Sequence, residues 1–347
     1  MKNEIKNYEL KIKNGGRREG RKLKIWITWI ISLLLLIILP LIGYNCGNYY
    51  AIHVAGLVGI YCILCVGLNI TVGYTGLLDL GFMSFCAIGA YTAVLLSIKG
   101  IPFWITLPIS LFLGGFIRYL LGVPVLRLRG DYLAIVTLAF GEIVRLIANN
   151  FDWLTNGPKG LPRVGEKIAE IRLFSLVFND DLQFYYLIFF FLAGTILISY
   201  RLEHSRIGRA LVAIREDELA AGLSGINVSQ IKSIAFVLSG MFGALAGAIY
   251  VHWIGFISPE MFTFRESVLL VSMIVIGGMG NIGGAILGVI LLVGIPEILR
   301  PVLGTKFVDY RMLIFGMIMI VVIIFRPEGI LRSKRRAGEL KIKNYEL

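Results

Sequence analysis

The stretch IWITWIISLLLLIILPLIGY (residues 25–44) is a run of 20 residues without a charged side chain, and it directly follows a basic segment. A helix of about 20 apolar residues is long enough to cross the roughly 30 Å hydrocarbon core of a membrane. The stretch is too long for the apolar region of a signal peptide, and it lacks a small-residue cleavage site. We therefore predict that it is retained as a first membrane-spanning helix.

The composition of the whole chain points the same way. Of the 347 residues, 57% are hydrophobic and only 16% are charged, whereas soluble domains contain roughly 25% charged residues. The 40 glycines fall inside apolar runs as well as between them, which is typical of closely packed transmembrane helices. These features predict an all-α polytopic membrane protein, and they exclude a disordered chain, a collagen-like repeat and a disulfide scaffold.

Nine further apolar stretches have the character of spans. With the first stretch they predict about ten crossings, within a range of 8–11. They are residues 49–70, 79–98, 101–125, 132–148, 184–200, 231–253, 267–278, 285–299 and 312–325. The short pair at 267–299 forms either two crossings or a re-entrant pair.

Both ends of the chain are basic. Residues 1–24 hold nine Lys and Arg against three Glu, and residues 326–347 hold seven basic residues against three acids. The positive-inside rule therefore predicts that both tails are cytoplasmic and flank a transmembrane domain at 25–325, with an outer loop at 149–183 and a cytoplasmic loop at 201–230. Such tails can contact anionic lipid, whereas the scarcity of interleaved aromatic residues disfavours nucleic acid as a partner.

Four ionisable residues within or at the start of predicted spans are candidates for the solute path, because charges are costly in hydrocarbon. Arg118 and Glu142 lie at similar depth on neighbouring spans and could pair, and Arg145 is one turn from Glu142 on the same helix face. Asp79 stands at a predicted helix start, where it could meet a substrate amine or simply favour the helix N-terminus. A structural ion-pair role and a path role both stay open.

Two glycine-interrupted regions fall on the same predicted side of the membrane in separate halves of the chain. Their members are Gly73, Gly76 and Gly81 in the first region, and Gly277, Gly278, Gly280, Gly283 and Gly284 in the second. Broken helices at this depth indicate either a solute path or close packing of small residues. The second region also matches a dinucleotide-binding fingerprint by letter, but the required strand and helix context is missing. Cys62 and Cys65 have metal-ligand spacing, but they lie in an apolar stretch, and we predict no metal site.

The polar segment 201–230 predicts a short helix in its middle, suited to docking into a groove of a partner protein. The residues concerned are Arg215, Glu216, Asp217, Glu218, Ala220, Ala221 and Gly225. The alternative is a solvated cytoplasmic loop.

Five stretches resemble, in the same order, the LivM-type permeases of bacterial branched-chain amino acid ABC importers. They are GLNITVGYTGLLDLGFMSFCAIGAY (67–91), LRLRGDYLAIVTLAFGEIVRLIANN (126–150), SRIGRALVAIREDELAAGLSGIN (205–227), GFISPEMFTFRESVLLVSMIVIGGMGNIGGAILG (255–288) and FRPEGIL (325–331). All five lie within residues 57–331.

The resemblance implies a non-enzymatic subunit of an ATP-driven importer in the plasma membrane of a prokaryote. Its partners would be a second, LivH-like permease, two ABC ATPase subunits and an extracytoplasmic substrate-binding protein. The chain would bind no cofactor itself, since ATP and Mg²⁺ would be used by the ATPase, and the sequence contains no G-x-x-x-x-G-K-[ST] motif.

The resemblance also implies that Glu218, Ala220, Ala221 and Gly225 belong to the helix that docks on the ATPase. The spacing from Glu218 to Gly225 is one residue longer than the general pattern, and Leu219 interrupts it. Leucine, isoleucine and valine are the implied substrates. Urea, short amides and aromatic acids stay open, as does an ion-coupled secondary transporter that uses Asp79, Glu142 and Arg145.

Overall fold

The computed structural model describes residues 49–126, 128, 130–162, 171–173, 176–177, 180–303, 316–317, 320, 324 and 329–331. The predicted first span at 25–44, the tail at 1–24 and most of residues 312–347 lie outside these described residues. The chain divides into two compact units, Met1–Ile52 and His53–Leu347. The contacts that follow all belong to the second unit.

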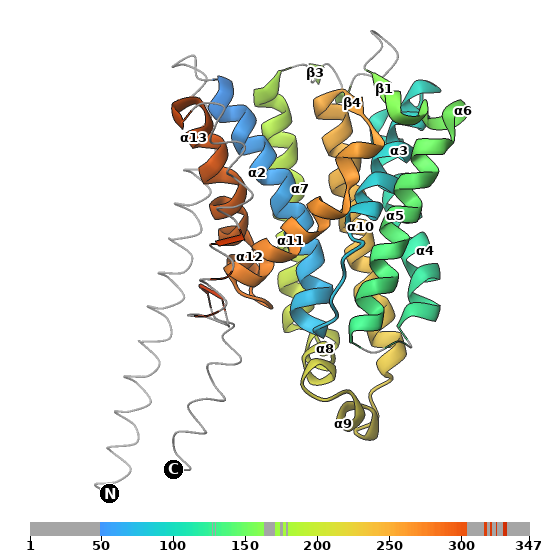
Figure 1. Cartoon of the computed structure of the whole chain (residues 1–347), viewed down its shortest axis with the longest axis vertical. Coiled ribbons are helices and arrows are strands. Elements are labelled where there is room, and N and C mark those ends of the chain that lie inside the picture. The colour runs from blue at the N-terminus through green and yellow to red at the C-terminus, as the bar shows by residue number, and fades with distance from the viewer. Residues whose placement is uncertain are drawn as a thin grey trace, which may run out of the picture. The chain divides into compact units, whose positions relative to one another are not determined.

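Long helices make up most of the described chain (Figure 1). They are α2 (Tyr49–Asn69), α3 (Met83–Ile98), α4 (Phe103–Val125), α5 (Asp131–Asn150), α7 (Asp181–His204), α10 (Val228–Ile254) and α11 (Phe264–Gly277). Shorter helices are α6 (Asp152–Thr155), α8 (Arg206–Glu216), α9 (Glu218–Leu223), α12 (Ile282–Val289) and α13 (Ile295–Leu303). Two π-helical segments, η1 (Ile70–Thr75) and η4 (Ile290–Gly294), and two 3₁₀ turns, η2 (Gly157–Lys159) and η3 (Pro259–Phe262), complete the helical elements.

Six helical segments of the described chain are long and apolar enough to cross a membrane. They are Tyr49–Thr75, Phe103–Val125, Tyr132–Asn150, Asp181–His204, Val228–Ile254 and Ile282–Arg300. The prediction of an all-α polytopic membrane protein is therefore confirmed. The predicted span 79–98 starts too early, because α3 begins only at Met83 and has 16 residues.

Small residues allow α3, α4 and α10 to pack closely against one another (Figure 1). A Cβ atom at Gly89 would collide with the backbone of Ala244, and one at Gly247 would collide with the carbonyl of Cys86. Close approach of this kind provides the van der Waals contact that holds helices together in lipid, where the hydrophobic effect does not drive association.

The region 267–299 forms separate packed helices. The chain turns out of α11 at Gly278, whose φ of 124° is readily adopted only by glycine. α12 begins after Asn281, whose side chain accepts a hydrogen bond from the Gly283 amide at 3.0 Å. A Cβ at Gly277 would collide with the carbonyl of Gly284. The glycines of this region therefore allow the chain to turn after α11, and they allow α11 and α12 to pack closely.

Four short strands lie at one end of the long helices, and α8 and α9 lie at the other end (Figure 1). The strand β1 (Leu161–Pro162) pairs antiparallel with β4 (Phe256–Ile257), and β2 (Arg172–Leu173) pairs antiparallel with β3 (Leu176–Val177). The pairing of β1 with β4 ties the segment after α5 to the end of α10. The described strands of the predicted outer loop 149–183 thus stand at the opposite end of the long helices from α8 and α9 of the loop 201–230.

Candidate functional site

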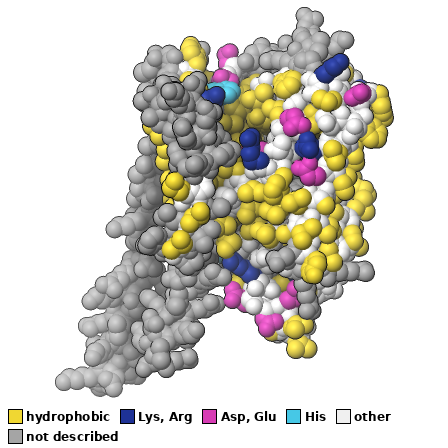
Figure 2. Space-filling view, in the orientation of Figure 1, with side chains coloured by type: hydrophobic (Ala, Val, Ile, Leu, Met, Phe, Trp, Pro, Cys, Tyr) yellow, Lys and Arg dark blue, Asp and Glu magenta, His cyan; other side chains and the backbone are white. Residues whose placement is uncertain are grey.

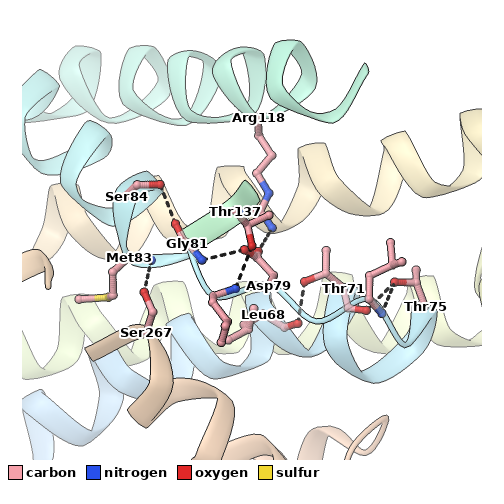
Figure 3. Close-up of polar contacts among 12 residues, drawn as sticks. Leu68, Thr71, Thr75, Asp79, Gly81, Met83, Ser84, Arg118, Thr137 and Ser267 are labelled. Atoms are coloured by element: carbon pink, nitrogen blue, oxygen red, sulfur yellow. Dashed lines mark hydrogen bonds and ion pairs between the residues drawn. The ribbon is translucent and has the colours of Figure 1, made fainter. Parts of the chain in front are cut away.

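An extended segment between η1 and α3 interrupts the helical structure in the first glycine region. The π-helix η1 ends at Thr75 and is followed by Gly76, which adopts φ 72°, and the next helix begins only at Met83. This unwound segment places Asp79 inside the bundle rather than at an interfacial helix start. Figure 3 shows Asp79 in this segment, facing Arg118 of α4.

Asp79 and Arg118 form an ion pair through Oδ2 and Nη2, and both side chains are 0% exposed. The guanidinium also lies over the rings of Phe85 and Phe236, with its Cζ 4.3 and 4.7 Å from the ring centroids. Arg118 Nε and Nη1 are buried and have no hydrogen-bond partner among the described residues, so the aromatic faces supply part of the compensation for the charge. A buried pair of this kind is costly to break, because either partner alone would be an uncompensated charge.

The rest of the unwound segment is fixed by hydrogen bonds to its surroundings (Figure 3). Asp79 Oδ1 accepts from the Gly81 amide at 3.1 Å, and Thr137 Oγ1 of α5 accepts from the Leu80 amide at 3.1 Å. Ser267 Oγ of α11 accepts from the Met83 amide at 3.2 Å. A Cβ at Gly81 would collide with the Thr137 carbonyl. The segment therefore holds α3, α4, α5 and α11 in register around Asp79.

Arg118 thus has a different partner from the Glu142 that the sequence suggested. Glu142 instead pairs with Arg145 on its own helix, at 2.9 Å, and Arg145 also reaches Glu260 of η3 at 2.9 Å. Depth along two neighbouring helices places Arg118 and Glu142 at the same level, but it does not decide which way each helix is rotated. Arg118 is turned toward the bundle interior, whereas Arg145 is 22% exposed.

The group formed by Glu142, Arg145 and Glu260 lies on the partly exposed side of α5. In α5, only 22% of the 18-residue apolar stretch that could cross a membrane is buried inside the protein. The corresponding share in α10 is 72%. On one face of the molecule, Figure 2 shows acidic and basic side chains gathered within a mainly hydrophobic surface. Charges that faced lipid there would be strongly disfavoured, so a face of this kind needs water or protein against it.

The two glycine-interrupted regions meet in the structure. Asn69, which is 1% exposed, accepts a hydrogen bond at Oδ1 from the amide of Gly280 at 2.9 Å. A Cβ at Gly73 would collide with that same Asn69 oxygen, and it would lie 2.7 Å from the Gly280 nitrogen. Arg215 of α8 donates from Nη1 to the Gly73 carbonyl at 2.5 Å. Residues from both halves and from the loop at 201–230 therefore meet at one point.

The end of α11 is capped by a segment from much later in the chain. The amides of Ile330 and Leu331 donate to the carbonyls of Ile276 and Gly277, each at 2.9 Å. A Cβ at Gly278 would collide with the carbonyl of Leu331. The last carbonyls of a helix lack donors within it. These two amides therefore supply hydrogen bonds that the carbonyls at the end of α11 would otherwise lack.

The loop at 201–230 contains two helices where the sequence predicted one. Asp217 has extended backbone between α8 and α9, and its Oδ1 accepts from the amides of Leu219 and Ala220 at 2.8 and 3.0 Å. An aspartate that caps the following helix competes with continued helix formation, which is the physical reason for the break. Gly225, at φ 84°, ends the turn after α9. Glu216 is the last residue of α8.

The helix α9 is held against α10 by an ion pair and presents apolar side chains outward. Glu218 Oε2 lies 2.7 Å from Nζ of Lys232, whose side chain is only 3% exposed. Leu223 is 91% exposed, whereas Ala221 is buried. A cavity of about 270 Å³ beside α9 is lined by Leu77, Leu128, Gly130, Asp217, Glu218, Leu219 and Lys232.

Several residues of these sites were not selected from the sequence. Asn69, Lys232 and Glu260 each contribute a contact between segments far apart in the chain. Lys232 and Asn69 could have been selected as polar residues within or beside apolar runs, whereas Glu260 stands in a polar loop without a comparable signal. Cys62, Cys65 and Cys86 are buried and are not joined in disulfides among the described residues. No metal-binding group of three or more residues is found in the described part of the chain.

Comparison with known proteins adds independent information. The family described as "Branched-chain amino acid transport system / permease component" matches residues 50–323. The high-affinity branched-chain amino acid transport system permease protein LivM of Escherichia coli (strain K12) is 41% identical over 84% of this chain and 72% of its own length. The LivM protein of Salmonella typhimurium is 39% identical over 85% of this chain and 72% of its own length.

More distant relatives cover parts of the chain or have lower identity. The permease protein LivH of Escherichia coli (strain K12) is 34% identical over 40% of this chain and 43% of its own length. No solved structure matches the chain. The long match to the family and the identity to LivM proteins show that the chain belongs to the permease components of branched-chain amino acid transport systems.

Proposed function

We propose that this chain is the permease subunit of an ATP-driven importer of leucine, isoleucine and valine in the plasma membrane of a prokaryote. The observation that carries the proposal is the 41% identity over 84% of the chain to a LivM permease of a branched-chain amino acid system. The chain is a multi-pass membrane protein, and its sequence has no phosphate-binding G-x-x-x-x-G-K-[ST] motif. In this proposal, ATP and Mg²⁺ are therefore bound by partner ATPase subunits.

The proposed assembly contains a second, LivH-like permease, two ATPase subunits and an extracytoplasmic binding protein. The pairing of permeases is supported by the separate similarity of this chain to LivM and LivH proteins. We propose about ten crossings with both termini in the cytoplasm. Support comes from the apolar stretches at 25–44 and 312–325 and from the basic tails that flank them.

We propose that the partly exposed charges of α5 line the solute path beside the second permease. Arg145 carries one positive charge between the carboxylates of Glu142 and Glu260, and the surrounding helix face is apolar. A zwitterionic amino acid with an apolar side chain matches both properties. In this scheme, Asp79 and Arg118 hold the bundle together, because their charges satisfy one another in the interior.

We propose that α9 docks on the ATPase. Its exposed Leu219 and Leu223 offer apolar contacts at the end of the bundle, while the pair of Glu218 with Lys232 anchors the helix to α10. Closure of the ATPase dimer would then move α8 and α9 together, since Asp217 joins them directly. The binding protein would deliver its ligand at the opposite end, where β1 pairs with β4.

The experiment that tests this function is co-purification of the tagged chain from native membranes, followed by reconstitution of the recovered complex in liposomes. Recovery of an ATPase, a second permease and a binding protein, with leucine uptake that requires internal ATP and Mg²⁺, is the expected result. ATP-dependent uptake of urea or a short amide instead of leucine would change the assigned substrate to that compound. Uptake by the chain alone on an ion gradient would reject the ABC assignment.

A further inference from the structure

We propose that Arg215 is the positioning residue through which α8 and α9 control the two glycine-broken segments, so that its loss separates ATP hydrolysis from solute movement. The inference rests on the proposed function, because it assumes that a partner ATPase docks at α9. It adds the specific link between that docking surface and the interior of the bundle.

Arg215 lies beside α9 in the chain and also contacts the first glycine-broken segment. It lies in the last turn of α8, two residues before Asp217, which caps α9. Its Nη1 donates to the carbonyl of Gly73, a residue 142 positions earlier in the chain. Movement of α8 therefore acts directly on the backbone of η1.

The Gly73 carbonyl that Arg215 contacts lies in the last turn of η1. Carbonyls in the last turn of a helix lack donors within that helix, and a cation near them also opposes the helix dipole. η1 ends at Thr75, and a Cβ on the following Gly76 would lie 3.0 Å from Cγ of Arg215. The arginine thus covers the end of η1 directly before the unwound segment that carries Asp79.

The same arginine also abuts the second broken segment. A Cβ at Gly280 would lie 3.1 Å from the Gly73 oxygen and 3.3 Å from Nη1 of Arg215. The Gly280 amide in turn donates to Asn69 at the start of η1. One guanidinium therefore stands where segments from both halves of the chain converge, and a shift of α8 changes both contacts together.

The test uses the complex of this chain with its co-purified ATPase, second permease and binding protein in liposomes. Arg215→Ala removes the donor, Arg215→Gln keeps an uncharged donor, and Arg215→Lys keeps a charge and a donor without the planar guanidinium. Arg209→Ala is the matched control, because Arg209 is an exposed arginine of the same helix, and its Nη1 donates to the carbonyl of the nearby His204 at 3.4 Å. Two rates are measured for each variant: leucine uptake and ATP hydrolysis with and without loaded binding protein.

We expect Arg215→Ala to assemble and to hydrolyse ATP in the absence of binding protein at about the wild-type rate. Its uptake per ATP hydrolysed should fall about tenfold, a coupling change within the usual range for linked sites. Arg215→Lys should recover part of the ratio, whereas Arg209→Ala should keep the wild-type ratio. A purely structural role would lower assembly and both rates together and would leave their ratio unchanged.

An unchanged ratio of uptake to hydrolysis in assembled Arg215→Ala would overturn the proposal. If the alanine variant does not assemble, the ratio in Arg215→Gln and Arg215→Lys decides in the same way, and failure of all three to assemble would assign Arg215 to folding alone and equally overturn it. A wild-type complex that shows no ATP-dependent uptake would instead reject the proposed function, before any variant is compared.

Discussion

The guanidinium of Arg118 in α4 is paired with the carboxylate of Asp79 in the unwound segment before α3, and neither side chain is exposed. These residues are 39 positions apart in the sequence. Their contact fixes a stretch of extended backbone inside a bundle of helices, where charges and free peptide groups are both costly. The pair is therefore a strong determinant of how α3 and α4 are placed.

Breaking this pair should destabilise the protein strongly. Asp79→Ala leaves Arg118 without an anion, and losses of about 3–5 kcal/mol are typical when one partner of a buried pair is removed. The free energy of unfolding can be compared by titrating the purified chain from mild detergent into SDS. The double variant Asp79→Ala with Arg118→Met should be less destabilised than Asp79→Ala alone. Strictly additive effects of the two substitutions would contradict the pairing.

Gly81→Ala should prevent correct packing of α3 against α5. The added methyl group would collide with the backbone carbonyl of Thr137, which cannot move without displacing α5. Gly194→Ala in α7 is the matched control, because a Cβ there meets no atom within 4 Å. We expect the Gly81 variant to give little folded protein by size-exclusion chromatography and the Gly194 variant to resemble the wild type. Equal yields of folded protein from the two variants would contradict the close contact between Gly81 and the Thr137 carbonyl.

The charges on α5 provide a test of the proposed solute path. Arg145→Met removes the cation that both Glu142 and Glu260 contact, and it should lower ATP-driven leucine uptake about tenfold or more, as expected for a charge-assisted contact worth about 1.5–3 kcal/mol. Glu260→Gln should have a smaller effect on stability, below about 1 kcal/mol, because this carboxylate is largely exposed. Uptake at saturating and limiting leucine separates binding from turnover. Wild-type uptake by the Arg145 variant would remove this face from the path.

Leu223→Asp should weaken docking of the ATPase while the chain itself remains folded. Leu223 is 91% exposed, so its substitution removes no packing within the chain. The effect on stability should stay within about 0.5 kcal/mol, as is usual at exposed positions. Recovery of the ATPase in a pull-down with the tagged chain is the measurement.

The control for that experiment is Ser229→Asp, which adds the same charge at an exposed position in the first turn of α10, where an acid is favourable. Its recovery of ATPase should equal that of the wild type. Equal recovery with both variants would place the docking surface elsewhere than on α9.

Much of the architecture could be predicted because it depends on local composition. The predicted spans at 101–125, 132–148, 184–200 and 231–253 agree with helices of the structure to within a few residues. The span at 79–98 did not, because contacts with Arg118, Thr137 and Ser267, which the local sequence does not show, hold its first residues in an extended conformation. The single helix predicted in the loop at 201–230 likewise divides at Asp217.

The sequence by itself determined that this chain is a helical membrane protein with two glycine-broken regions and a polar segment at 201–230. Those properties follow from hydropathy, glycine content and charge, which act within about 20 residues of the chain. Only the tertiary structure decided that Arg118 pairs with Asp79 rather than Glu142, and that Arg215 meets Gly73 beside Gly280. The reason is that pairing depends on how packed helices are rotated about their axes, and this rotation is set by many contacts between distant residues rather than by spacing along one helix.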